Sequence, residues 1–223
     1  MSHPSPSLPD APSPTRPRLR GWLHLGAFPA VLLAGLVLVA LGPTTGARLA
    51  SAVYVATSAL LFGISGTYHR QQDTRLLELL RRFDHANIYL IIAGTYTPFA
   101  VVALDGTVRI VVLGVVWTGA VAGVLFRTMW VGAPRWLYVS LYIALGWVAV
   151  FFLPQFLDGV GIAACVLVAL GGIAYSAGGV VYGLKRPDPS PRWFGFHEVF
   201  HACTLAAYVM QYIAVSLVVY QSA

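Results

Sequence analysis

Two histidines that lie four residues apart are the side chains best placed to do chemistry in this sequence. His197 and His201 belong to the run HEVFH inside an apolar segment, and Ser65 and His69 show the same offset in an earlier one. Helical side chains four positions apart share one face, so two imidazoles can reach one metal ion. A third histidine from another helix, with one position left for water, completes the usual ligand set of a catalytic zinc. The spacing predicts a zinc site formed by His69, His197 and His201.

Each of these residues also has a structural interpretation. Two histidines four apart occur by chance in many helices, and His69 could anchor a helix end at the membrane interface. Asp84 could cap a helix N-terminus, where a carboxylate meets the helix dipole favourably. Ser65 could donate to a carbonyl of its own helix. The metal interpretation is favoured because these residues converge in a chain with only 10% charged residues, and ionisable side chains at membrane depth are costly.

Other ionisable residues near these motifs have no ligand-like spacing. His85 follows Asp84 and should point about 100° away around the helix, so it ranks below His69 as a competing ligand. Glu198 directly follows His197, so its side chain should likewise point about 100° away from that histidine. We assign it no catalytic role. His3 and His24 lie in the N-terminal tail and at the entrance of the first apolar segment. Neither is predicted to be a ligand.

The elements that must position these residues are membrane helices. The 223 residues are 58% hydrophobic and 10% charged, whereas a soluble domain carries roughly a quarter charged residues. The apolar residues come in long blocks such as 110–126 and 163–184. A helix that crosses the bilayer needs about 20 mostly apolar residues. The composition therefore excludes a soluble fold.

Apolar blocks separated by glycine and proline breaks predict an all-α, polytopic membrane protein with seven transmembrane helices. The predicted helices are 22–41, 49–69, 84–103, 107–126, 136–154, 159–183 and 196–219. Pro98 should kink the third helix, which membrane helices tolerate. In this arrangement His69 ends the second helix, Asp84 opens the third, and His197 and His201 open the seventh. All four residues are thus expected at one membrane face.

The distribution of basic residues predicts the orientation. With the N-terminus in the cytoplasm, the cytoplasmic segments hold twelve of the fourteen: Arg16, Arg18, Arg20, Arg70, Arg75, Arg81, Arg82, Arg127, Arg135, Lys185, Arg186 and Arg192. The opposite face holds only Arg48 and Arg109. We therefore predict a multi-pass protein of the inner (plasma) membrane with its N-terminus inside and its C-terminus outside. The same bias accounts for the formal charge of +6, and no nucleic-acid partner is expected.

The first twenty residues form a separate region. Residues 1–20 are rich in proline and serine and end in three closely spaced arginines, which predicts a disordered cytoplasmic tail before a transmembrane domain over 21–223. A cleaved signal peptide is the alternative, but the apolar run 22–41 is longer than a typical signal-peptide core. Cys165 and Cys203 lie in apolar segments. We interpret them as small buried hydrophobes rather than as a disulfide.

Three motifs together resemble the hemolysin III family. They are Ser65-x3-His69, the run FDHANIYLIIAGTYTPF at 83–99, and His197-x3-His201. The family comprises bacterial relatives of the progestin and adipoQ receptors (PAQR), which include the adiponectin receptors. The resemblance covers essentially the whole chain after the tail.

The resemblance implies a seven-helix bundle with an internal N-terminus and a zinc ion held by His69, His197 and His201. It also implies a water or hydroxide on the zinc, steadied by Asp84 and Ser65. The wider group includes alkaline ceramidases, and its proposed activities centre on the hydrolysis of lipid amides or esters. A membrane lipid is thus the expected substrate or ligand.

The leading hypothesis is a zinc-dependent, ceramidase-like hydrolase of a membrane lipid. Asp84 would act as general base toward the attacking water and later donate a proton to the leaving group, and Ser65 would hold the water or the oxyanion. One alternative is a non-enzymatic receptor or regulator of membrane homeostasis with a structural zinc. Another is a cytolytic (haemolytic) membrane protein, although a seven-helix bundle has no obvious amphipathic pore-forming segment.

Overall fold

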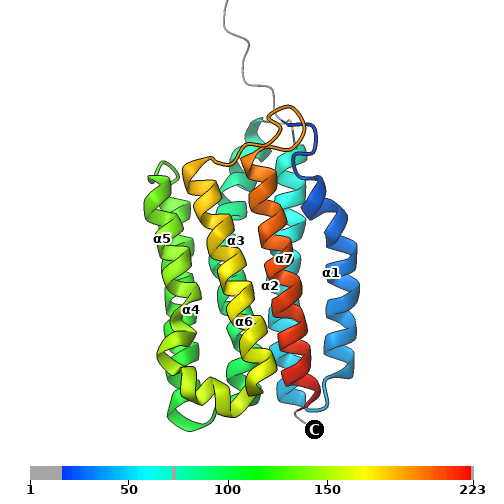
Figure 1. Ribbon diagram of the computed structural model, residues 1–223, viewed down its shortest axis with the longest axis vertical. Helices are drawn as coiled ribbons and strands as arrows, with labels where there is room; N and C mark the ends of the chain where they lie inside the picture. The colour runs from blue at the N-terminus through cyan, green and yellow to red at the C-terminus, as the bar shows by residue number, and fades with distance from the viewer. Residues whose placement is uncertain (1–16, 72–73, 222–223) are drawn as a thin grey trace, which may run out of the picture.

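The computed structural model describes residues 17–71 and 74–221, and this part of the chain is helical without a β-sheet. The elements are α1 (Trp22–Leu41), α2 (Thr45–Arg70), α3 (Thr74–Ala103), α4 (Gly106–Met129), α5 (Arg135–Gly146), the 3-10 helix η1 (Val148–Phe152), α6 (Leu153–Leu184) and α7 (Phe196–Tyr220). They form one upright bundle in which α1 begins at one end and α7 finishes at the other (Figure 1). The all-α prediction is confirmed.

Helices that follow one another in the chain pack side by side. The pairs α1–α2, α2–α3, α3–α4 and α6–α7 make the most extensive contacts, and α7 also touches α1. Helix α3 contacts α2, α4, α5, α6 and α7, so it forms the centre of the bundle. We call the end of the bundle where α2 finishes and α7 begins the histidine end.

Within the described part of the chain, six helical stretches are long and apolar enough to cross a membrane. Large apolar side chains such as Leu33, Ile110 and Ile162 face outward and are exposed, as expected where lipid rather than water surrounds the bundle. The chain is therefore a multi-pass membrane protein. One of the six stretches, Arg135–Leu184, is 50 residues long and contains both α5 and α6. The predicted spans 136–154 and 159–183 fall within it, so the count of seven stays a prediction.

The break between α5 and α6 is held by a tyrosine of the central helix. The Tyr96 hydroxyl donates to the carbonyl of Gly146 at 2.8 Å and accepts from the N–H of Ala149 at 2.8 Å. Both backbone groups lie where the chain leaves the α-helical pattern, and in a membrane such groups must find partners inside the protein. Gly161, with φ 77°, then interrupts α6, and this left-handed conformation favours glycine. The first part of α6 crosses the end of the bundle before the helix turns back (Figure 1).

Helix α3 begins ten residues before the predicted start at residue 84. The extension is amphipathic and charged, and it lies outside the apolar block from which the start at residue 84 was predicted. Glu78 pairs with Arg81 at 2.8 Å and with Arg82 at 3.3 Å, at i+3 and i+4 spacing, and such pairs stabilise an exposed helix. The correction matters for Asp84, because this residue lies well inside α3 and cannot cap its N-terminus.

The last residues of the predicted tail are held against the loop before α7. The backbone N–H groups of Arg18 and Leu19 donate to the carbonyls of Arg192 and Trp193. The Arg18 guanidinium also lies 4.5 Å from the centre of the Trp193 ring, a favourable cation–π geometry. The rest of the predicted disordered tail, residues 1–16, lies outside the described residues. Cys165 and Cys203 are both free.

The contact between α3 and α4 predicts one stability effect. A Cβ atom added at Gly123 would lie 2.3 Å from the ring of buried Tyr89, so Gly123→Ala should overpack the interface. Overpacking typically costs about 1–3 kcal/mol, and we expect a lower midpoint of thermal unfolding in detergent. Gly114→Ala is the matched control on α4, because no described atom lies within 4 Å of its added Cβ. Equal midpoints for both variants would show that the Tyr89 ring moves aside without cost.

Candidate metal centre

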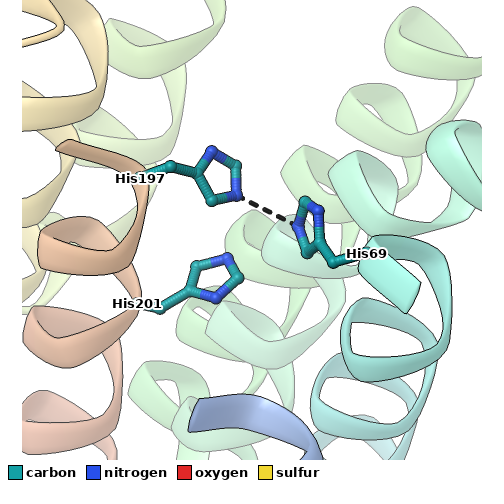
Figure 2. Close-up of side chains that lie close together, drawn as sticks. All are labelled: His69, His197 and His201. Atoms are coloured by element: carbon teal, nitrogen blue, oxygen red, sulfur yellow. Dashed lines mark hydrogen bonds between the residues drawn. The ribbon is translucent and has the colours of Figure 1, made fainter. Parts of the chain in front are cut away.

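Three imidazoles from two helices meet at the histidine end of the bundle. His69 lies at the end of α2, and His197 and His201 lie on the first turns of α7. The Nε2 atoms of His69 and His197 are 3.0 Å apart (Figure 2). One ligand nitrogen from each of the three rings lies within 4.8 Å of the others. The structure thus brings together the three residues that the spacing of the sequence singled out.

The geometry of this cluster fits a metal ion. Two nitrogens bound at 2.0–2.1 Å to a tetrahedral zinc lie about 3.3 Å apart, close to the separation of His69 and His197. Imidazole nitrogens suit zinc, copper, iron and nickel. Among the described residues the cluster contains three potential ligands, which leaves a tetrahedral position for water or substrate. The three histidines could therefore hold a metal ion.

A carboxylate lies beside the cluster. Asp84 Oδ2 is 3.9 Å from His69 Nε2, too far for a direct hydrogen bond but close enough for one water to interact with both groups. The hydroxyl of Ser65, one helical turn before His69, lies beside the Asp84 carboxylate. Ser65 is almost fully buried. Asp84 therefore lies beside the three histidines, outside the group of three potential ligands.

The first turn of α7 is fixed by a buried carboxylate. Glu198 is 1% exposed. Its Oε2 accepts from the N–H of Gly195 at 2.8 Å, and its Oε1 accepts from Arg20 Nε. These bonds satisfy a free N–H of the helix start and pair the buried charge, as both must be inside a protein. Glu198 thus holds the helix turn that carries His197.

A fourth histidine, which the sequence analysis set aside, lies against the cluster. The His24 ring on α1 stacks on the His201 ring, with centroids 3.8 Å apart and planes within 5°. The start of α1 also packs on His69, because a Cβ at Gly21 would lie 2.7 Å from His69 Cβ. Spacing within one helix could not reveal His24, since only the packing of α1 on α7 brings it there. The sequence feature that could have drawn attention to His24 is that it is an ionisable residue inside an apolar segment.

His85 is engaged outside the cluster. Its Nδ1 lies 2.8 Å from the Arg81 carbonyl, and its Nε2 lies 3.3 Å from the Tyr182 hydroxyl. The Tyr142 hydroxyl donates to the His85 carbonyl at 3.0 Å. Both ring nitrogens thus have partners of their own, as expected for a residue ranked below His69.

The histidine cluster opens onto a cavity of about 200 Å³ in the bundle. Polar side chains line its end at the cluster: His24, Ser65, Asp84, His197 and His201. Much of the remaining wall is apolar and reaches Phe99, Phe156 and Val160 near the opposite end of the bundle. Asp84 and Phe99 are fifteen residues apart on α3, a rise of about 22 Å. The cavity is therefore long and mostly apolar, with a polar end at the histidines.

Comparisons with known proteins match most of the chain. Residues 13–212 match the family described as Haemolysin-III related. The chain is 32% identical to Hemolysin-3 of Bacillus cereus over 177 residues. This match covers 77% of this chain and 76% of that protein. It is 31% identical over 145 residues to the Hemolysin-3 homolog of Bacillus subtilis (strain 168), with 65% and 68% covered. No solved structure gives a significant match. The resemblance seen in the sequence motifs is confirmed.

The geometry predicts the metal content of the purified protein. We expect one divalent metal ion per chain by elemental analysis, and His197→Ala or His201→Ala should remove most of it, because two imidazoles hold an ion far more weakly than three. His85→Phe is the control, since His85 is engaged elsewhere, and it should retain the ion. Full metal content in both α7 variants would show that these histidines are not ligands.

Proposed function

We propose that this chain, which belongs to the haemolysin-III related family, is a zinc-dependent hydrolase of membrane lipid amides or esters. One observation carries the proposal: three imidazoles, a carboxylate and a hydroxyl meet at the polar end of a long apolar cavity. A scissile carbonyl and its acyl chain need both environments side by side. This pairing of environments supports a lipid amide or ester as the substrate class.

The three histidines are the residues that would hold zinc. Imidazole is a preferred zinc ligand, and three protein ligands with an open fourth position are typical of catalytic rather than structural zinc sites. Bound there, zinc supplies Lewis acidity toward a water molecule and a carbonyl oxygen. The first turn of α7, fixed by Glu198, sets the direction of His197 and His201, and the end of α2 sets that of His69.

Asp84 is the proposed general base. Its carboxylate lies 3.9 Å from His69 Nε2, so a water next to the cluster can donate a hydrogen bond to it. As this water attacks the carbonyl carbon, Asp84 accepts its proton and later donates that proton to the leaving amine or alcohol. The Ser65 hydroxyl lies beside the Asp84 carboxylate, and its single proton would serve either to hold the attacking water or to stabilise the developing oxyanion.

The cavity offers space for the acyl chain of the lipid. It follows α3 for about 22 Å. This length exceeds the contribution of one leaflet, which is about half of the roughly 30 Å hydrocarbon core. Its walls at Ile92, Phe99 and Phe156 are apolar. A lipid bound with its carbonyl at the histidines could therefore keep its chain out of water throughout the reaction.

The proposed arrangement in the inner membrane has seven crossings, with the N-terminus and the tail 1–20 in the cytoplasm and the C-terminus outside. Two observations support it. In Figure 1, α5 and α6 are separate legs joined at the end of the bundle opposite the histidine end. The described basic residues lie at or near the histidine end, except Arg48 and Arg109 at the starts of α2 and α4. This asymmetry matches the excess of basic residues on the cytoplasmic side of membrane proteins.

Deep burial of the cluster favours one alternative. His197 is 9% exposed and His201 is 2% exposed, which also suits a structural zinc in a non-enzymatic receptor or regulator of membrane homeostasis. Hydrolysis of lipid amides or esters by pure protein, lost on chelation of zinc, would favour the enzyme. A cytolytic role, suggested by the names of the Bacillus relatives, would instead require leakage from liposomes without lipid turnover.

The orientation predicts where a C-terminal reporter is active. Alkaline phosphatase fused after Ala223 should be active, because it folds only outside the cytoplasm, while green fluorescent protein at the same position should stay dark after export by the Sec pathway. The same pair of reporters fused after Arg127, near the end of α4, is the control and should give the opposite result. A fluorescent C-terminal fusion would require an even number of crossings.

The role of Asp84 predicts a variant that separates catalysis from metal binding. Asp84→Asn removes the proton acceptor without removing an imidazole, so zinc should remain while the hydrolysis rate falls about 10²–10⁴-fold. His69→Ala should lose both zinc and hydrolysis. The measurements are zinc per chain and turnover of a lipid amide in detergent micelles.

Asp158→Asn is the matched control for this experiment. Asp158 is exposed near the opposite end of the bundle, and its amide variant should keep both zinc and activity. If Asp84→Asn hydrolyses the lipid at the wild-type rate, Asp84 has a structural role. If it loses zinc as completely as His69→Ala, Asp84 is a metal ligand.

A further inference from the structure

A groove on the outer face of the bundle lies apart from the central cavity. Its lining residues come from α1, α2 and α3 and include Leu25, Phe28, Leu60, Ile64 and Leu80. Its volume is about 300 Å³, and it shares no lining residue with the cavity at the histidines. Leu60 is 43% exposed, as expected for a wall that faces the membrane. The groove is therefore an apolar surface that a lipid of the bilayer would meet.

The dimensions of the groove suit one acyl chain. Its lining residues on α2 extend from Ala59 to Thr67, a rise of about 12 Å along the helix. One leaflet contributes about half of the roughly 30 Å hydrocarbon core, so the groove is nearly as long as one leaflet is deep. A neighbouring α-helix is about 10 Å across, which suits a groove of this volume less well than a single chain of methylene groups.

A cation and an indole ring lie at the histidine end of the groove. Arg70 follows Thr67 by three residues on α2, and Trp22 precedes Leu25 by three residues on α1. Each therefore continues one wall of the groove, because helical residues three apart share a face. The Arg70 guanidinium lies 4.3 Å from the centre of the Trp22 ring, and both residues are exposed. Arg70 has no carboxylate partner within the described part of the chain.

This pair of side chains has the chemistry of a site for a phosphate at the membrane surface. A guanidinium can donate two parallel hydrogen bonds to one phosphate group, and tryptophan is enriched at the level of the lipid headgroups. The described basic residues of the histidine end also outnumber the acidic ones, which are Glu78, Asp84, Asp188 and Glu198. This excess of positive charge favours a headgroup with a net negative charge over a zwitterionic one.

We propose that the groove binds one acidic phospholipid, with an acyl chain between α1 and α2 and its phosphate at Arg70. The bound lipid would lie against the end of α2, directly beside the residue that carries the His69 imidazole. It is a ligand of the outer surface and not the substrate of the proposed hydrolase. The inference does not depend on that function, because the groove and the cavity have no lining residue in common.

The first test compares two phospholipids with the same acyl chains. In native mass spectrometry of the detergent-solubilised protein, dioleoyl phosphatidylglycerol should bind about fivefold more tightly than dioleoyl phosphatidylcholine, the effect expected of one arginine near an acidic lipid. In Arg70→Gln the two dissociation constants should agree within about twofold. Arg70→Lys keeps the charge and should retain most of the preference.

Arg186→Gln is the matched control for the charge. Arg186 is equally an exposed basic residue at the histidine end, but it follows α6 and does not line the groove. Its amide variant should keep the wild-type preference between the two lipids. All variants should elute from a size-exclusion column as the wild type does, which verifies that they are folded.

The second test fills the groove. Ala59→Phe places a ring among the lining residues, so it should weaken both lipids about fivefold through lost van der Waals contacts and leave the preference between them unchanged. Ala30→Phe adds the same ring at an exposed position of α1 outside the groove and should bind both lipids as the wild type does. Inorganic phosphate should not displace phosphatidylglycerol, because it has no chain to occupy the groove.

Five results would overturn the inference. They are equal affinity of the wild type for the two lipids, a full preference in Arg70→Gln, an equal loss of preference in Arg186→Gln, equal effects of Ala59→Phe and Ala30→Phe, and displacement of the lipid by inorganic phosphate. A dimer that Ala59→Phe converts to a monomer would also overturn it and assign the groove to a helix of a second copy. Hydrolysis of lipid amides enters none of these measurements, so this inference and the proposed function can fail separately.

Discussion

The approach of α2 to α7 at His69 and His197 is the contact around which the histidine end is organised. Two ring nitrogens 3.0 Å apart inside an apolar bundle require a shared proton or a shared ion, because two unshared lone pairs would repel. The neighbouring elements all brace this contact. The start of α1 packs on His69, and Glu198 fixes the first turn of α7.

The same rule, that polar groups at membrane depth need partners within the protein, shapes the opposite end. There the chain leaves the helical pattern between α5 and α6, and Tyr96 satisfies the backbone groups of Gly146 and Ala149. The long cavity is lined by residues on both sides of this break. A continuous straight helix over Arg135–Leu184 could not turn back along α3 to enclose such a cavity.

Much of the fold was predictable because membrane helices leave a strong signal. The apolar run 22–41 gives the bounds of α1 directly, and the i, i+4 spacing of His197 and His201 places both on one face. The predicted start of α3 was wrong because the first turns of this helix are charged and lie outside the apolar block. His24 was missed because its role depends on how α1 packs against α7, which no spacing within a segment encodes. The backbone hydrogen bond from Arg18 to Arg192 is likewise a tertiary contact between segments that are distant in the sequence.

The partners of the buried polar side chains separate those that hold the fold from those that face a ligand. The Glu198 carboxylate accepts hydrogen bonds from Gly195 and Arg20. Both of its oxygens therefore serve to fix the start of α7. Asp84 lies beside Ser65 and lines the cavity next to the histidines. His24 lines the same cavity with no protein partner. Asp84 and His24 thus belong to the wall of the cavity, whereas Glu198 belongs to the framework that holds the start of α7.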